Sequence, residues 1–92
     1  EVQVLKFPKF FTPNGDGFND SWTISDLNDQ PEAKIHVFDR YGKLLKVFPP
    51  TQSWDGFFHG KEMPSDDYWF RAVFEHQGVL REHKSHFTLK RL

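Results

Sequence analysis

The sequence contains no cysteine, which excludes disulfides, thiolate catalysis and cysteine-based zinc sites. It also has no apolar run near the roughly 18 residues of a membrane-spanning helix, so we expect the chain not to span a membrane. Neither sign of charge is in clear excess, because 12 basic and 13 acidic side chains give a formal net charge of -1. Without an overall positive field, nucleic acid binding is not expected.

Aromatic residues are abundant, with 11 Phe, 3 Trp and 2 Tyr, although only 37% of all residues are hydrophobic. A few large rings must therefore supply most of the core, since each can bury about 150–250 Å². A chain of 92 residues fits one small domain. We therefore expect a single domain over residues 1–92.

Turn residues are spread through the chain, with 6 Gly and 6 Pro, and no stretch keeps a helical apolar period over three turns. This punctuation predicts an all-β protein, an antiparallel Ig-like β-sandwich of about seven short strands. The clearest expected strands are residues 2–11, 21–25, 33–38, 44–48, 67–76 and 85–92.

Residues 67–76 are expected to form the most regular strand, with Tyr68 and Phe70 on one face and Trp69 and Arg71 on the other. Residues 33–38 and 44–48 flank the turn signal Tyr41-Gly42-Lys43, which predicts a β-hairpin. In the last strand, Phe87 and Leu89 are expected to face inward.

A candidate metal loop lies at residues 11–20, where Asn14, Asp16 and Asp20 are separated by glycines. Oxygen ligands on a tightly wound loop suit Ca²⁺, and glycine permits the backbone conformations that such winding requires. The alternative is a cluster of Asx turns, in which the same side chains cap local backbone N–H groups. Both interpretations stay open, with the Asx cluster favoured.

No arrangement of residues indicates catalysis. Asp66 and Asp67 are adjacent, so on a strand they face opposite ways and do not form a glycosidase-type pair. No nucleophile elbow, P-loop or dinucleotide fingerprint occurs. His83 and His86 also point to opposite faces, so a shared zinc site is not expected. We therefore expect a protein that is not an enzyme.

Two aromatic features could serve binding. Trp54-Asp55-Gly56 is either a sugar-stacking platform or, as we favour, a turn whose Trp packs against the core. Phe38, Trp69 and Val73 fall on the outer face of the predicted sheet. Such a row is either covered by a loop or offered to a partner protein.

Four segments together resemble one family, the gliding motility-associated C-terminal domain, which is the type B sorting domain of the type IX secretion system. They are residues 11–20 (FTPNGDGFND), residues 37–43 (VFDRYGK), Ser53-Trp54-Asp55-Gly56, and residues 64–69 (PSDDYW) with the ending at residues 87–92 (FTLKRL). The resemblance runs from about Pro8 to the last residue. The chain departs from the family at Asp66-Asp67-Tyr68, where Gly-Thr-Tyr is usual, and at Phe57-Phe58, where a small polar residue is usual.

This resemblance implies a secretion address carried covalently by a larger cargo protein. The implied partners are components of the type IX translocon and small outer-membrane partner proteins of that system. The cargo would pass through the periplasm and outer membrane to the cell surface or the medium. The rival hypothesis is an Ig-like adhesive module that binds carbohydrate or protein, with or without stabilisation by calcium.

The candidate partner surface combines two groups of residues. The first contains aromatic rings in excess of what one small core needs, and the second belongs to the last strand, whose edge could extend a partner's sheet. The candidates are Phe38, Phe57, Phe58, Trp69, Phe87, Leu89, Lys90 and Arg91.

Overall fold

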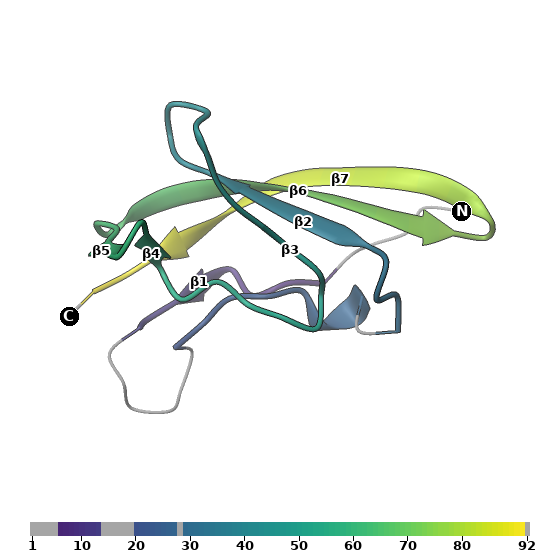
Figure 1. The fold of residues 1–92 in the computed structure, drawn as a ribbon, viewed down its shortest axis with the longest axis horizontal. Coiled ribbons are helices and arrows are strands. Elements are labelled where there is room, and N and C mark those ends of the chain that lie inside the picture. Colours follow the sequence, from purple (N-terminus) through teal and green to yellow (C-terminus); the bar gives the residue numbers. More distant parts are fainter. Residues whose placement is uncertain (1–5, 14–19, 28, 92) are drawn as a thin grey trace.

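The computed structural model describes residues 6–13, 20–27 and 29–91. Its strands are β1 (Phe10–Phe11), β2 (Lys34–Phe38), β3 (Leu44–Phe48), β4 (Phe57–Phe58), β5 (Lys61–Glu62), β6 (Asp66–His76) and β7 (Val79–Leu89), and η1 (Ser25–Leu27) is one turn of 3-10 helix (Figure 1). The prediction of an all-β fold is confirmed. Within these residues no helix is long and apolar enough to cross a membrane.

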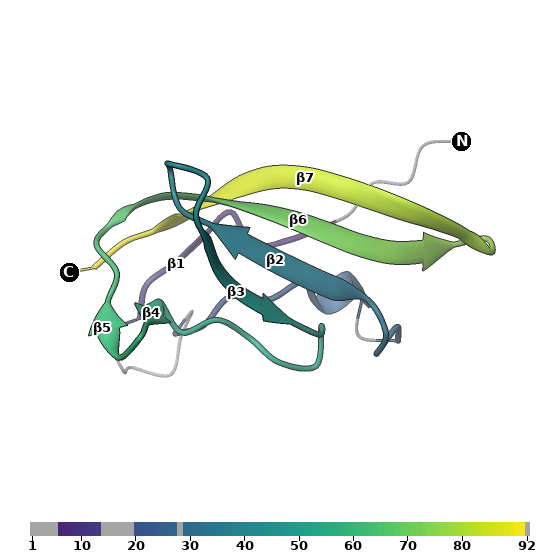
Figure 2. The same cartoon turned by 45° about the horizontal axis from the view of Figure 1, so that its top comes forward.

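Five strands form one sheet in the order β1-β7-β6-β2-β3, and β4 pairs with β5 separately (Figure 2). The pairs are antiparallel with one exception, since β1 runs parallel to β7. Thr88 N–H donates to the Lys9 carbonyl at 2.9 Å, and Lys90 N–H donates to the Phe11 carbonyl at 3.0 Å. The first and last strands of the described residues are therefore neighbours.

The β2–β3 hairpin forms where the sequence predicted it. One carboxylate oxygen of Asp39 accepts from the backbone N–H groups of Tyr41 and Lys43, each at 2.9 Å. Gly42 has a φ of +84°, a conformation that glycine adopts without steric cost. The register shifts between Val37 and Phe38, which bends the end of the hairpin.

The prediction of a last strand over residues 85–92 is wrong at both ends, because β7 begins at Val79 and finishes at Leu89. Residues 79–86 are mostly exposed and, after Val79 and Leu80, entirely polar, so no alternation in the sequence marks them as a strand. Their partner decides the structure: β6 and β7 stay in register from Asp66↔Leu89 to His76↔Val79.

The strand predicted over residues 21–25 is also wrong. Only one β-bridge forms there, between Trp22 and Trp54, with N–H···O distances of 2.8 and 2.9 Å in the two directions. The chain then turns into η1. The segment around Trp54 that faces Trp22 is rich in turns, so only this one pair of residues can form bridge hydrogen bonds. Trp22 and Ile24 are both buried, as their alternation predicted.

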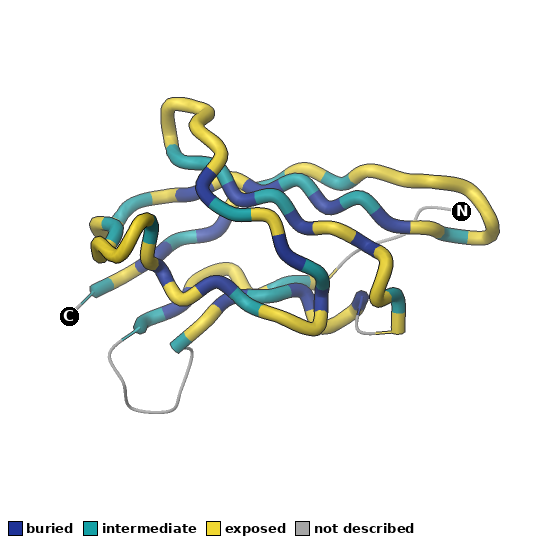
Figure 3. The backbone as a smooth tube through the Cα atoms, viewed as in Figure 1, coloured by how far each residue is buried: buried dark blue, intermediate teal, exposed yellow. Residues whose placement is uncertain are grey.

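The core lies between the inner face of the five-stranded sheet and a second layer of largely irregular chain that includes Trp22 and Trp54 (Figures 1 and 3). Large rings fill it, as predicted. Trp22 stacks on Phe87 with centroids 4.1 Å apart, and Trp54 meets Tyr68 edge-on at 5.2 Å. The most buried rings are Phe11, Trp22, Phe48, Trp54, Tyr68, Phe70 and Phe87.

Candidate recognition surface

The segment after β7 is held against the turns around β4 and β5 by one arginine. Arg91 Nε donates to the Met63 carbonyl at 2.7 Å, Nη2 to the Gly56 carbonyl at 2.9 Å and Nη1 to a Glu62 carboxylate oxygen at 3.0 Å. The backbone N–H of Arg91 donates to Ser65 Oγ at 2.7 Å. We call Arg91 and these four partners the Arg91 clamp.

The Trp54-Asp55-Gly56 turn leaves space for the Arg91 side chain at Gly56. Gly56 has a φ of +84°, and a Cβ at this position would lie 3.0 Å from Arg91 Nη2 and 3.1 Å from Leu89 Cδ1. The Trp54 indole N–H donates to the Phe57 carbonyl at 2.9 Å, and its ring is fully buried. Trp54 is therefore a core residue, and the favoured interpretation of this motif is confirmed over the sugar platform.

Tyr68, in the motif at residues 64–69, contacts the Trp54-Asp55-Gly56 turn. Its hydroxyl donates to the Pro64 carbonyl at 2.7 Å, and its ring packs against Trp54. Burial, reinforced by the Asp66 carboxylate, raises the pKa of Tyr68 to about 12. Arg40 of the β2–β3 turn reaches Asp66 at 3.4 Å, so that turn is also tied to this end of the domain.

The described parts of the four motif segments thus converge at one end of the domain, where Figure 1 places the C-terminus. Their side chains mainly close turns, fill the core and hold the last segment. Phe87 and Leu89 are fully buried, so their side chains are not exposed to a partner in the folded domain. Their inward positions on β7, which the alternation did predict, place them against the core.

Arg91 is committed to the clamp and only 19% of its side chain is exposed, so it is not a free contact for a partner. Lys90 is exposed, and its ammonium lies 5.3 Å from the centre of the Phe10 ring. Of the four C-terminal candidates, Lys90 alone remains open at the surface among the residues that the structure describes.

The four aromatic candidates separate into two pairs. Phe57 and Phe58 form β4; Phe57 is 42% exposed, whereas Phe58 is half-buried with the Lys43 ammonium 4.8 Å from its ring centre. Phe38 and Trp69 lie directly opposite each other on β2 and β6, and Trp69 is 43% exposed. The latter pair faces away from the core, as predicted.

The next outward positions on the same two strands are basic. Arg71 follows Trp69 at a spacing of two, and His36 lies opposite it, so both share the face of Phe38 and Trp69. The His36 ring lies parallel to Phe38, with centroids 6.4 Å apart. We call these four residues the outer-face block.

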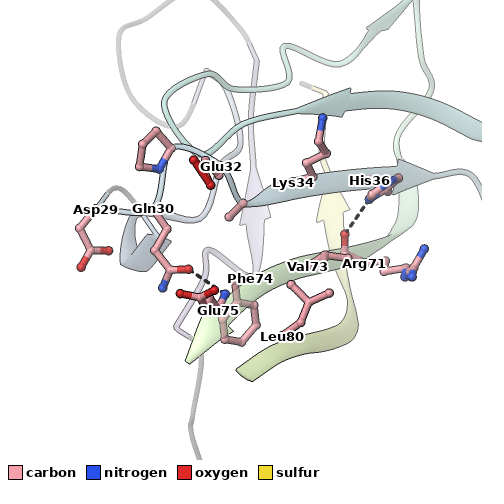
Figure 4. Close-up of a pocket in the computed structure, with 12 residues that line it drawn as sticks. Asp29, Gln30, Glu32, Lys34, His36, Arg71, Val73, Phe74, Glu75 and Leu80 are labelled. Atoms are coloured by element: carbon pink, nitrogen blue, oxygen red, sulfur yellow. Dashed lines mark hydrogen bonds between the residues drawn. The ribbon is translucent and has the colours of Figure 1, made fainter. Parts of the chain in front are cut away.

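A shallow groove continues from this block between β6 and the turn that precedes β2 (Figure 4). Its two ends differ in charge: the basic end holds Lys34, His36 and Arg71, and the acidic end holds Asp29, Glu32 and Glu75. Gln30 closes the groove on one side, since its carbonyl oxygen accepts the Glu75 backbone N–H at 2.8 Å.

The predicted calcium ligands are only partly visible. Asn14 and Asp16 lie outside the described residues, and Asp20 is half-buried. Among the residues that the structure does describe, no group of three His, Asp or Glu side chains is arranged to hold a metal ion.

The fold and the converging motifs define the class of this protein, a small Ig-like β-sandwich. Comparison with known families then gives its membership: the chain belongs to the CHU_C type IX secretion signal domain family, which matches residues 5–89. The resemblance inferred from the four motifs is confirmed, and the domain is a sorting signal for type IX export. Searches of curated proteins and of solved structures gave no match.

Proposed function

We propose that this domain works by recognition and not by catalysis. In this proposal, translocon components and small outer-membrane proteins of the type IX system bind the folded domain. The attached cargo then passes from the periplasm across the outer membrane to the cell surface or the medium. One observation supports this: most motif side chains close turns or fill the core, whereas Phe38 and Trp69 of the motifs and the neighbouring Arg71 stay accessible on the outer face.

The test is a periplasmic reporter fused upstream of the 92-residue chain. It is expressed in a bacterium with an active type IX system and in the same strain without its translocon channel. We expect the reporter outside the first strain only. Equal amounts outside both strains would overturn the proposal.

Deletion of residues 87–92 is a poor test of recognition, because it removes the buried Phe87 and Leu89 together with the Arg91 clamp. A loss of export could then be caused either by unfolding of the domain or by loss of a contact with a partner. Point substitutions on the exposed outer face avoid this ambiguity.

Calcium binding by Asn14, Asp16 and Asp20 stays a prediction from the sequence. If the loop binds Ca²⁺, calorimetry will show heat on titration and the melting temperature will rise with Ca²⁺. Asp16→Asn should weaken both effects, with Asp29→Asn as the control on an exposed acidic residue elsewhere. Neither heat nor a rise in melting temperature would contradict the prediction.

A further inference from the structure

The outer-face block joins two kinds of contact at a fixed spacing. Trp69 and Phe38 form one rung of the β6–β2 pair, and Arg71 and His36 form the next outward rung. Outward positions two residues apart on a strand lie about 6.5–7 Å from each other. The block therefore offers an aromatic contact and a cationic contact at the repeat of an extended chain.

Arg71 has unused hydrogen-bonding capacity. Its Nε contacts a carboxylate oxygen of Glu82, and no residue in the described part of the chain accepts a hydrogen bond from its two terminal nitrogens. The side chain is 43% exposed. A guanidinium with a free planar fork binds a second carboxylate well, because two parallel N–H···O bonds can form.

One carboxylate of the chain, that of Glu82, is already bound on this face. It lies on β7 next to the block, where Arg71 holds one of its oxygens and the Lys84 ammonium lies 3.5 Å from the other. The hydrogen bond from Arg71 lowers the pKa of the Glu82 carboxyl. Lys34, at the basic end of the groove, adds further positive charge beside Arg71 and His36 (Figure 4).

The centre of the face is therefore basic, although the whole chain has a net charge of -1. Among the described acidic residues of this face, Glu82 is paired with Arg71 and Lys84, Asp67 accepts from the Thr88 hydroxyl at 2.7 Å, and Glu75 lines the far end of the groove. Such local charge favours an acidic ligand at the centre.

We propose that the outer-face block docks an extended, acidic segment of a protein partner, with an apolar side chain on Trp69 and Phe38 and a carboxylate on Arg71. This deepens the proposed function by naming the chemistry that the translocon side presents. The few residues that contribute most of the binding energy at protein interfaces are enriched in Trp and Arg. The i, i+2 spacing of the block matches alternate side chains of an extended peptide.

The direct test is an NMR titration of the 92-residue chain with synthetic peptides. One peptide alternates Asp and Phe at two-residue spacing with Thr between them, and a second replaces every Asp by Asn. We expect the Asp peptide to shift the signals of Trp69, Arg71 and His36, and to bind at least about tenfold more tightly than the Asn peptide. Its affinity should fall as salt is raised.

Two substitutions and two matched controls locate the binding. Trp69→Thr, which places a strand-favouring β-branched residue at this position, and Arg71→Gln should each weaken binding about tenfold or more. Phe57→Ala removes a ring of similar exposure, 42% against 43% for Trp69, and Lys61→Gln removes an exposed cation far from the block. Neither control should change the affinity.

The docking proposal is overturned by equal binding of the Asp and Asn peptides, by no binding, or by equal affinity in all four variants. It is also overturned if a uronic acid oligosaccharide, and not the peptide, shifts the block, since the ligand would then be a glycan. The reporter assay keeps the two proposals apart. If the wild-type domain exports its reporter and Arg71→Gln exports it equally, only the docking proposal fails; if the wild-type domain does not export, the proposed function fails.

Discussion

Two arginines on this domain show how the same side chain serves two purposes. Arg91 is 19% exposed, and each of its three side-chain nitrogens donates to a neighbour within 3.0 Å. Arg71 is 43% exposed, and only its Nε is engaged among the described residues. The difference teaches that a fully satisfied arginine stabilises the fold, whereas one with free donors is available to a ligand.

The tryptophans repeat this contrast. Trp54 is fully buried and packs with Tyr68 and Phe87, while Trp69 is 43% exposed on the opposite side of the sheet from the core. The Arg91 clamp should therefore respond to mutation through stability, and the outer-face block through recognition.

The largest effect on stability is expected at Gly56. A methyl group there meets Arg91 and Leu89 at 3.0 and 3.1 Å, and the φ of +84° is strained for alanine. Gly56→Ala should lower the free energy of unfolding by about 2–4 kcal/mol. Gly60→Ala is the matched control, because Gly60 has a φ of +79° with no atom within 4 Å of the added methyl, and it should cost about 1 kcal/mol. Urea unfolding measures both, and equal losses would contradict the close packing at Gly56.

Substituting each arginine by methionine compares the two regions directly. Arg91→Met leaves the Met63 carbonyl without its donor and removes one of the two donors to the Gly56 carbonyl, which keeps the Met63 N–H at 2.8 Å. We therefore expect a loss of about 2 kcal/mol. Arg71→Met breaks an exposed ion pair, which contributes about 0–1 kcal/mol. Thermal melts of the two variants check this order. A larger loss from Arg71→Met would show that the clamp does not hold the fold.

A smaller effect is confined to alkaline pH. The pKa of Tyr68 is raised from 10.0 to about 12 in the folded domain, so the unfolded chain releases this proton first. Stability is fully present below pH 10 and declines as the pH rises from about 10 to about 12. Tyr68→Phe should remove this contribution to the decline while costing some stability at neutral pH, because the Pro64 carbonyl loses its donor. An identical alkaline decline in both proteins would contradict the burial of the Tyr68 hydroxyl.

The sequence predicted the parts of the fold that depend on local patterns. The β2–β3 hairpin has its turn residues at the required positions, and β6 alternates buried apolar side chains with more exposed ones from Tyr68 to Phe74. The first half of β7 has no such alternation, so its structure follows from pairing with β6. Trp22 was expected in a strand but forms only an isolated β-bridge, because its partner Trp54 lies in a turn-rich segment.

The candidate site was predictable to a similar extent. The outward position of Phe38 and Trp69 followed from alternation, and the structure adds Arg71 and His36 on the next rung. The Arg91 clamp could not be foreseen, since Arg91 and Gly56 are distant in sequence and meet only in the folded chain. Phe87 and Leu89 carry a useful lesson: residues expected to face the core are poor candidates for partner contact.

The most direct test of the whole account measures export and stability together for the double variant Trp69→Thr/Arg71→Gln. With the reporter fused upstream, the account predicts that export falls about tenfold or more while the melting temperature of the domain stays near that of the wild type. Export at the wild-type level from this double variant would contradict the claim that the outer face carries the recognition signal.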